Sequence, residues 1–357
     1  MHYRTMALPD DDKPLTAATV AAIPKVELHC HVEGTMRAST AKELAERHGI
    51  TFPVDDPLDL YHYRDLTGFL EVFWLIQSVL GDRDAWERLA YESAVDAAAH
   101  GLVYRESFFT PARHLRSGLR LADIIAGLDD GFSRAERETG VITRLIFDID
   151  RDFGPQVGLQ HVGELVELRH EGRPGTERVI GLGMDSTERG VEPSTFLRSY
   201  RLAASAGLRL TAHQGENSPS SAVATAVDVL RCERIDHGIS VIEDEHLTAR
   251  LADIRVPFTV CPNANVRINP DVCADLSAHA FPRMRAAGLL VTLNTDDPAL
   301  TGLDLTQEYL LCAEAFGYGY VDLVAIALDG VEASWLDPAE KASLCARIAK
   351  ATTTAVP

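Results

Sequence analysis

Histidines and carboxylates follow four short apolar or β-branched runs of the sequence. The four motifs are His29-Cys30-His31, Thr211-Ala212-His213, Ile235-Asp236-His237 and Asn294-Thr295-Asp296-Asp297. Imidazole nitrogens and carboxylate oxygens are the groups that bind hydrolytic metal ions. Because side chains alternate along a strand, both histidines of the first motif face the same side of a strand end and can share one cation. The motifs therefore predict a metal centre that activates water.

Groups from four separate runs meet only if the strands that carry them end at a common edge. Eight segments have strand character, namely 26–31, 103–109, 142–149, 179–184, 209–213, 234–237, 257–260 and 290–294. Helix-period stretches lie between most of them, at 121–138, 193–206, 222–230 and 243–252. Alternating strands and helices indicate a parallel sheet, and eight parallel strands close into a barrel with one shared rim. We therefore expect an α/β protein, a (β/α)8 TIM barrel.

The connection between the first two strands departs from this alternation. It spans roughly seventy residues, far more than one crossover helix needs, so we expect extra helices inserted after strand 1. Within it, residues 65–80 (DLTGFLEVFWLIQSVL) are strongly apolar and include Phe69, Phe73 and Trp74. Two interpretations stay open: a helix that roofs a pocket for a flat aromatic ligand, or a helix that packs on the core.

Composition and charge exclude several classes of function. The 357 residues, 46% apolar and 24% charged, are typical of a globular enzyme, and we expect an N-terminal arm at 1–22 followed by a single barrel domain at 23–357. The net charge of −19 disfavours nucleic acid and anionic membranes as partners. Six cysteines without a CxxC pair, no export signal and no long apolar run predict a cytoplasmic protein. The sequence does not determine the oligomeric state.

Four ordered motifs resemble those of the adenosine/adenine deaminase family, within the amidohydrolase superfamily. They are PKVELHCHVEGT at 24–35, HQGE at 213–216, RIDHG at 234–238 and NTDDP at 294–298. The resemblance runs along almost the whole chain. It implies hydrolytic deamination of a 6-aminopurine, of the adenosine or adenine type, to the 6-oxopurine and ammonia, with a purine base or nucleoside as the small-molecule partner.

The resemblance also implies a role for individual residues. One divalent ion, with Zn²⁺ favoured, is expected on His29, His31, His213 and Asp296. Glu216 is expected to donate a proton to N1 of the purine, for which either an apolar wall raises its pKa or the purine binds with the proton already shared. His237 is expected to orient the metal-bound water and to help deprotonate it, with Asp296 also catalytic. The expected substrate contacts are His31, Glu33, Ser186 and Asp297, the last to N7.

Departures from the family pattern bear on the substrate. Glu33 stands where adenosine-specific members have an aspartate, and Ser186 stands where nucleoside deaminases have a glycine, as in the adenine-deaminase branch. Gln214 and Asn217 depart from that branch. On the second strand, Glu106 is expected to brace Arg105 or a metal-binding histidine.

Three alternatives therefore stay open. The first is a deaminase of a modified adenine nucleoside such as aminodeoxyfutalosine. The second is an amidohydrolase that acts on a non-purine amide or ester, because a metal hydroxide also attacks carbonyl carbon. The third is a binding protein without activity, which would be expected to have lost a metal ligand or Glu216.

Overall fold

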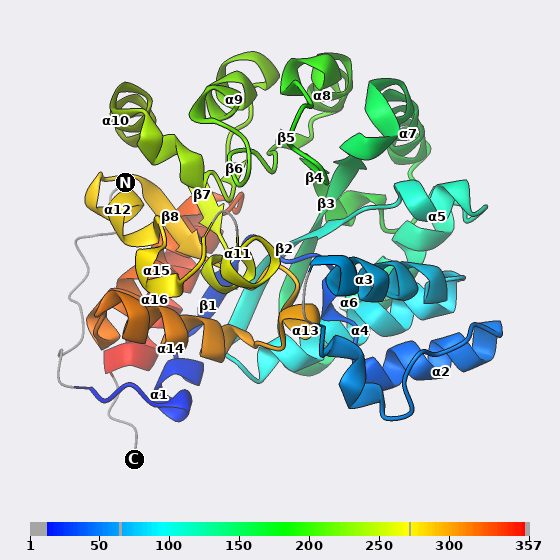
Figure 1. Ribbon diagram of the computed structural model, residues 1–357, viewed down its shortest axis with the longest axis horizontal. Coiled ribbons are helices and arrows are strands. Elements are labelled where there is room, and N and C mark those ends of the chain that lie inside the picture. Colours follow the sequence, from blue (N-terminus) through cyan, green and yellow to red (C-terminus); the bar gives the residue numbers. More distant parts are fainter. Residues whose placement is uncertain (1–12, 64–65, 271–272, 354–357) are drawn as a thin grey trace.

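Eight parallel strands form the centre of the molecule, as the sequence predicts. The computed structural model describes residues 13–63, 66–270 and 273–353. Strands β1 to β5 form one sheet and β6 to β8 a second, each in sequence order. Figure 1 shows the strands at the centre and the helices arranged around them. The strands are β1 (Lys25–Glu27), β2 (Leu102–Phe109), β3 (Ile142–Asp150), β4 (Val179–Asp185), β5 (Arg209–Leu210), β6 (Ile235–Asp236), β7 (Pro257–Val260) and β8 (Leu290–Leu293).

Isolated backbone bridges join the two sheets. Cys30 pairs with Asp296 between the ends of β1 and β8, and His213 pairs with Asp236 between β5 and β6. These bridges connect both pairs of sheet edges, so the strands close into the predicted TIM barrel.

Helices cover the outside of the barrel, and each follows a strand. Asp82, Asp244 and Asp304 cap three of the molecule's helices through side-chain oxygens that accept first-turn N–H groups. The main covering helices are α6 (Leu121–Thr139), α7 (Gly154–His170), α8 (Leu197–Ser205), α9 (Ser220–Thr225), α10 (Glu245–Asp253), α12 (Phe281–Ala286), α14 (Leu305–Phe316) and α15 (Tyr320–Ala333). A π-helical turn at Ala226–Leu230 continues α9. Shorter helices at the strand ends are α5 (Ala112–Arg116), α11 (Pro262–Ile268) and α13 (Pro298–Thr301).

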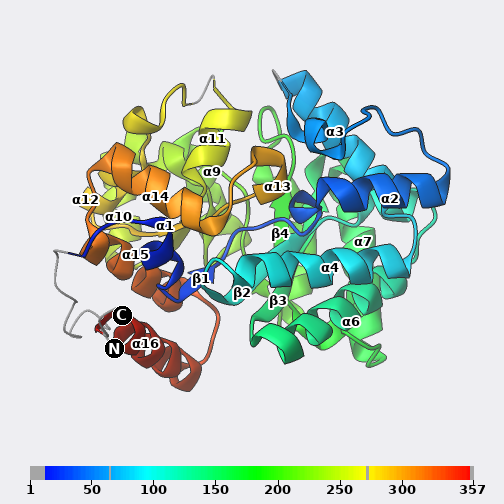
Figure 2. The ribbon, with the colours of Figure 1, turned by 90° about the horizontal axis from the view of Figure 1, so that it is seen from below.

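The expected insertion after strand 1 is present. It contains α2 (Ala38–His48), α3 (Leu66–Val79) and α4 (Arg83–Ala98). In Figure 2, α3, α11 and α13 lie on one side of the barrel and α16 (Pro338–Thr353) on the other. Asp65, the first residue of the apolar segment 65–80, lies outside the described residues. No helix in the described ranges combines the length and the apolar character that a bilayer crossing requires.

The end of the predicted N-terminal arm is helical. Helix α1 (Ala17–Ala21) packs on α14, and Val20 is fully buried. The Lys25 ammonium group donates to the carbonyl oxygens of Ile23 and His100, at 2.9 and 3.0 Å. It so connects the residues just before β1 with the residues just before β2. The division into an arm at 1–22 and a domain at 23–357 stays a prediction.

A buried ion pair fills the barrel interior below the strand ends. Glu106 of β2 accepts a hydrogen bond from Arg234, and both side chains are fully buried. The Arg234 guanidinium lies 4.0 Å from the ring centroid of Trp335, whose backbone N–H donates to Glu106 at 2.7 Å. The expectation that Glu106 braces Arg105 or a metal-binding histidine is wrong. Arg105 pairs with Glu27 instead, because neighbouring side chains on a strand point to opposite faces.

Replacing Glu106 by Gln should lower the free energy of unfolding by about 3 kcal/mol, because the buried Arg234 charge then keeps only the more distant Asp236 carboxylate, 3.8 Å from its Nε, as a counter-ion. The matched control is Asp228→Asn. Its pair with Arg250 is about half exposed, so the loss should stay below about 1 kcal/mol. Urea unfolding of both variants measures the difference, and equal losses would show that the buried pair contributes no more than a surface one.

Candidate metal centre and active site

The predicted metal-binding side chains converge where the barrel closes. The backbone N–H of His31 donates to the carbonyl of Asp296 at 2.8 Å, and that of Asp296 donates to the carbonyl of His29 at 3.2 Å. His213 lies at the other closure, bridged to Asp236. His213 and His237 therefore lie just beyond the short strands β5 and β6, held there by isolated bridges and single backbone hydrogen bonds.

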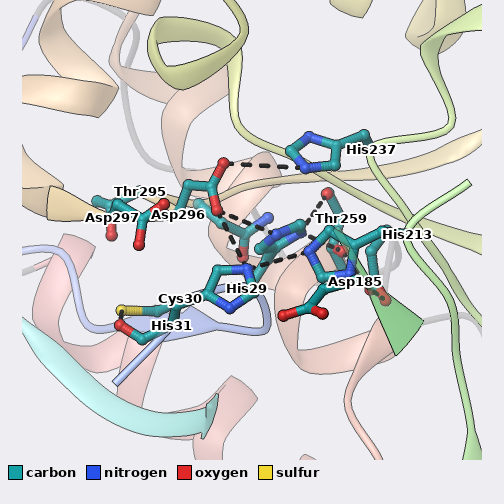
Figure 3. A network of polar contacts seen from close by, with 12 residues as sticks. His29, Cys30, His31, Asp185, His213, His237, Thr259, Thr295, Asp296 and Asp297 are labelled. Carbon is teal, nitrogen blue, oxygen red and sulfur yellow. Dashed lines mark hydrogen bonds and ion pairs between the residues drawn. The ribbon is translucent and has the colours of Figure 1, made fainter. Parts of the chain in front are cut away.

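The ring nitrogens and the Asp296 carboxylate lie close enough to share one ion. Nε2 of His31 is 3.0 Å from Nε2 of His213, and Oδ1 of Asp296 is 3.4 Å from Nε2 of both His29 and His31. His237 approaches the second oxygen, with Nε2 3.8 Å from Oδ2. Figure 3 shows these contacts of Asp296 with the three rings as dashed lines. The four residues predicted as metal ligands are thus brought close to one another, but not as a single tight group. Potential ligand atoms of His29, His213, His237 and Asp296 lie within 4.8 Å of one another, and those of His31, Asp148 and His213 form a second such group.

The hydrogen bonding of His29 provides a direct test of whether this donor set fits a cation. Its Nδ1 lies 3.0 Å from the carbonyl oxygen of Thr259, which can only accept, so Nδ1 carries the proton. Nε2 is then a bare lone pair, fully buried, and has no hydrogen-bond partner among the described residues. It faces a carboxylate oxygen of Asp296 that is also an electron-pair donor. A cation between the two atoms satisfies both, so the site fits a divalent metal ion.

Burial keeps the ligand rings neutral, as metal binding requires. Desolvation lowers the pKa of His29 to about 4 and that of His31 to about 3. It also lowers the pKa of His213 well below its usual value. Neutral imidazoles bind metal ions without first losing a proton.

Carboxylates and hydroxyls behind the rings hold them in place. Asp236 accepts from Thr211 and Thr259, at 2.7 and 2.8 Å, and its Oδ2 lies 3.9 Å from Nδ1 of His213. Oδ2 of Asp148 is 3.8 Å from the same nitrogen. These groups form the outer layer that fixes ligand orientation at metal sites.

Three site residues adopt the left-handed backbone region beyond their strand ends. The φ angles are 69° for Ser186, 59° for His237 and 65° for Asp296. Such conformations cost energy in a non-glycine residue and are concentrated at functional sites. Asp297, the next residue, lies against Gly34, where a Cβ atom would fall 1.8 Å from Oδ1 of Asp297. Only glycine at position 34 leaves room for this carboxylate.

Glu216 is a partly buried carboxyl group held by two amides. The Nδ2 groups of Asn265 and Asn269 both donate to its Oε1 at 2.8 Å. Burial, and then the nearby charges of Glu188 and Asp296, raise its pKa to about 8. The raised pKa agrees with the prediction, but the neighbours differ from the expected apolar wall, since the contacts are two asparagines.

A cavity of about 380 Å³ opens beside these groups. Of the residues predicted for the site, His31, Ser186, His213, Glu216, His237, Asp296 and Asp297 line it. Glu33 is 1% exposed, does not line this cavity, and accepts a hydrogen bond from the Thr110 backbone at 2.9 Å. His29 does not line the cavity, and its Nε2 instead faces the carboxylate of Asp296.

Helix α3 contributes to the cavity and to the core. Phe73 and Trp74 line the cavity, and Trp74 is half exposed. Ile76 and Val79 are fully buried in the core. Helix α3 therefore both packs on the core, as one interpretation predicts, and borders the cavity. Its role as a roof for a flat ligand stays a prediction. The side chain of Phe69 lies outside the described residues.

Sequence reasoning missed the residues that hold Glu216. Asn265 and Asn269 follow strand β7 in the run CPNANVRIN, where three asparagines after a strand end were a detectable signal. Glu188 accepts from the backbone N–H of Gly215 at 2.7 Å and of Glu216 at 3.2 Å, and so fixes the turn that carries Glu216.

Comparison with known proteins agrees with this geometry. The family model described as adenosine deaminase matches residues 24–351. An adenine deaminase of Rhodospirillum rubrum is 36% identical over 93% of this chain and 98% of its own length. The crystal structure of an adenine deaminase from Arthrobacter aurescens superposes with a TM-score of 0.85 at 34% identity, covering 92% of this chain and 98% of that one.

A second solved structure carries a metal. It is an amidohydrolase from Burkholderia ambifaria with bound Zn, with a TM-score of 0.86 at 33% identity over 97% of this chain and 95% of that one. The family model matches most of this chain, and the alignments cover nearly the full length of each relative. This chain is therefore a hydrolytic deaminase that belongs to the adenosine deaminase family.

Proposed function

We propose that this chain hydrolyses free adenine to hypoxanthine and ammonia, with one Zn²⁺ ion held by His29, His31, His213 and Asp296. Its general reaction, the deamination of an aminopurine, follows from the family and its relatives. The proposal of a substrate and a metal rests on one observation: Glu216, Asp297 and three of the predicted metal ligands line the same cavity. Free adenine is the favoured substrate because relatives at about 35% identity are named adenine deaminases.

The side chains around the cavity match the edge of a 6-aminopurine. A divalent ion held by this donor set would supply the chemistry of water activation, since it would lower the pKa of water towards neutrality. Glu216, neutral at pH 7 because its pKa is raised, donates its proton to N1 as the ring loses aromaticity. Burial also raises the pKa of Asp297 well above its usual value, so its carboxyl group can donate a hydrogen bond to N7. His237 and Asp296 orient the attacking water. Ser186 also lines the cavity and would contact the rest of the substrate.

The charge of the cavity argues for a substrate without phosphate. Among its lining residues are seven acidic side chains but one arginine, Arg113. The acidic side chains are Asp150, Asp152, Asp185, Glu188, Glu216, Asp296 and Asp297. Burial raises the pKa of Asp185 to about 8, so Asp185, like Glu216 and Asp297, is uncharged at pH 7. A nucleotide phosphate would be repelled by the other acidic groups, among them Asp152 and Glu188. The six cysteines are free and buried, which supports a reducing compartment, and we propose the cytoplasm.

A panel of aminopurines should separate the substrates. Adenine should be deaminated with the highest kcat/KM, adenosine less well, and AMP at least about 10²-fold more slowly than adenosine because of phosphate repulsion. The fall in ultraviolet absorbance and the release of ammonia measure each rate. Efficient turnover of a modified adenine nucleoside, with none of adenine, would overturn the assignment of the free base and leave the site chemistry in place.

Replacing Glu216 by Gln should leave the metal bound but lower kcat by about 10²–10⁴, the usual contribution of a positioned acid. In the unchanged protein, kcat/KM should fall as the pH rises through about 8, because Glu216 must be protonated to act and loses its proton there. The control is Glu245→Gln on exposed α10, which should keep both rate and pH profile. Normal turnover in the Glu216→Gln protein would exclude Glu216 as the proton donor.

Removal of the metal should abolish turnover. Dialysis against a strong chelator should yield a folded protein with no activity, and one equivalent of Zn²⁺ per chain should restore it. Mg²⁺ should not, because it prefers six oxygen ligands to imidazole nitrogens. Full activity in protein that elemental analysis shows to be metal-free would contradict the proposed role of the ion.

A further inference from the structure

A chain of hydrogen bonds connects the start of helix α12 with both Glu216 and His237. The backbone N–H of Phe281 lies 3.0 Å from Nδ1 of His279. Nε2 of His279 lies 3.2 Å from Oδ1 of Asn265. Nδ2 of Asn265 then lies 2.8 Å from Oε1 of Glu216 and 3.1 Å from Nδ1 of His237.

The backbone group at one end determines every donor and acceptor in this chain. A backbone N–H can only donate, so Nδ1 of His279 accepts. Burial lowers the pKa of His279 to about 4, so the ring is neutral at pH 7 and its single proton lies on Nε2. That proton is donated to Oδ1 of Asn265, which fixes the amide orientation. The Nδ2 group of Asn265, with its two hydrogens, therefore faces Glu216 and His237.

At Glu216, the amides determine which oxygen holds the proton. Asn265 and Asn269 both donate to Oε1, which uses the two lone pairs of that atom. The proton of the neutral carboxyl group is therefore on Oε2. Since Glu216 lines the cavity, its proton is held on one defined atom before the substrate enters.

At His237, the same amide determines the tautomer. Nδ1 accepts from Asn265, so the proton of the neutral ring lies on Nε2. This nitrogen faces Oδ2 of Asp296 at 3.8 Å. A ring with its proton on Nε2 donates a hydrogen bond from that atom and cannot take up a proton there.

We propose that Asn265, held by His279, is a positioning residue that places the acid proton on Oε2 of Glu216 and the ring proton on Nε2 of His237. His237 then orients the attacking water as a hydrogen-bond donor, rather than as the base that the resemblance implied. Neither Asn265 nor His279 is among the described residues that line the cavity, so both act through their neighbours. The effect on turnover rests on the proposed aminopurine substrate.

Variants at both ends of the chain test the proposal. Asn265→Ala should lower kcat by about 10- to 100-fold, the usual effect of losing an orienting neighbour, and leave KM within about threefold. His279→Leu should have a similar effect because Asn265 can then rotate. His279→Gln, which retains an N–H donor, should recover most of the rate. The matched control is Asn269→Ala, which removes a donor to Glu216 but none to His237.

Nitrogen-15 NMR of histidine-labelled, metal-loaded protein reads the tautomer directly. His237 should have its proton on Nε2 in the unchanged protein and in Asn269→Ala, and should become a mixture in Asn265→Ala and His279→Leu. Thermal unfolding of each variant identifies losses that are only structural. If Asn265→Ala does not fold, the comparison of His279→Leu with His279→Gln still tests the proposal.

Two results would overturn the proposal. One is a His237 proton on Nδ1 in the unchanged protein, and the other is a His279→Leu protein with unchanged kcat and tautomer. The tautomer measurement needs no substrate. A failure to deaminate any aminopurine would therefore overturn the proposed function alone, while the NMR result would still decide the role of Asn265.

Discussion

The site depends on electron-pair donors that face one another without a proton between them. The bond from Nδ1 of His29 to the Thr259 carbonyl turns the bare Nε2 of His29 toward a carboxylate oxygen of Asp296. Such an arrangement is unfavourable unless a cation lies between the donors. The remaining groups follow from it: neutral histidines around the ion, Asp236 behind them, and a protonated Glu216 at the cavity wall.

The interior of the barrel and the strand ends above it have different roles, and one short motif connects them. Arg234 is buried with Glu106 beneath the site, where it stabilises the interior. Two residues later, Asp236 accepts hydrogen bonds from threonines behind the metal-facing rings. His237 then turns into the cavity with a positive φ, and Gly238 follows in the same region. The RIDHG motif thus joins the core to the chemistry through the two-residue strand β6.

Much of the fold and of the metal site was predictable because both depend on local patterns. Short apolar and β-branched runs, alternating with helix-period stretches, predicted the positions of all eight strands. The His-x-His motif placed two rings on one side of a strand end. The extents of β1 and β5 were overestimated. Their ladders stop at Glu27 and Leu210, and Cys30, His31 and His213 join their neighbours through isolated bridges. Asn265 was missed because its contact with Glu216 joins residues 49 positions apart, and no periodicity encodes such a bond. The predicted role of Glu106 failed because it paired adjacent residues of one strand, whose side chains point apart.

The most direct test of the central claim is X-ray diffraction from crystals of the metal-loaded protein, recorded on both sides of the zinc absorption edge. We predict one anomalous peak bound by Nε2 of His29, His31 and His213 and by a carboxylate oxygen of Asp296. A peak bound by other side chains, or no peak in crystals of active protein, would contradict the account.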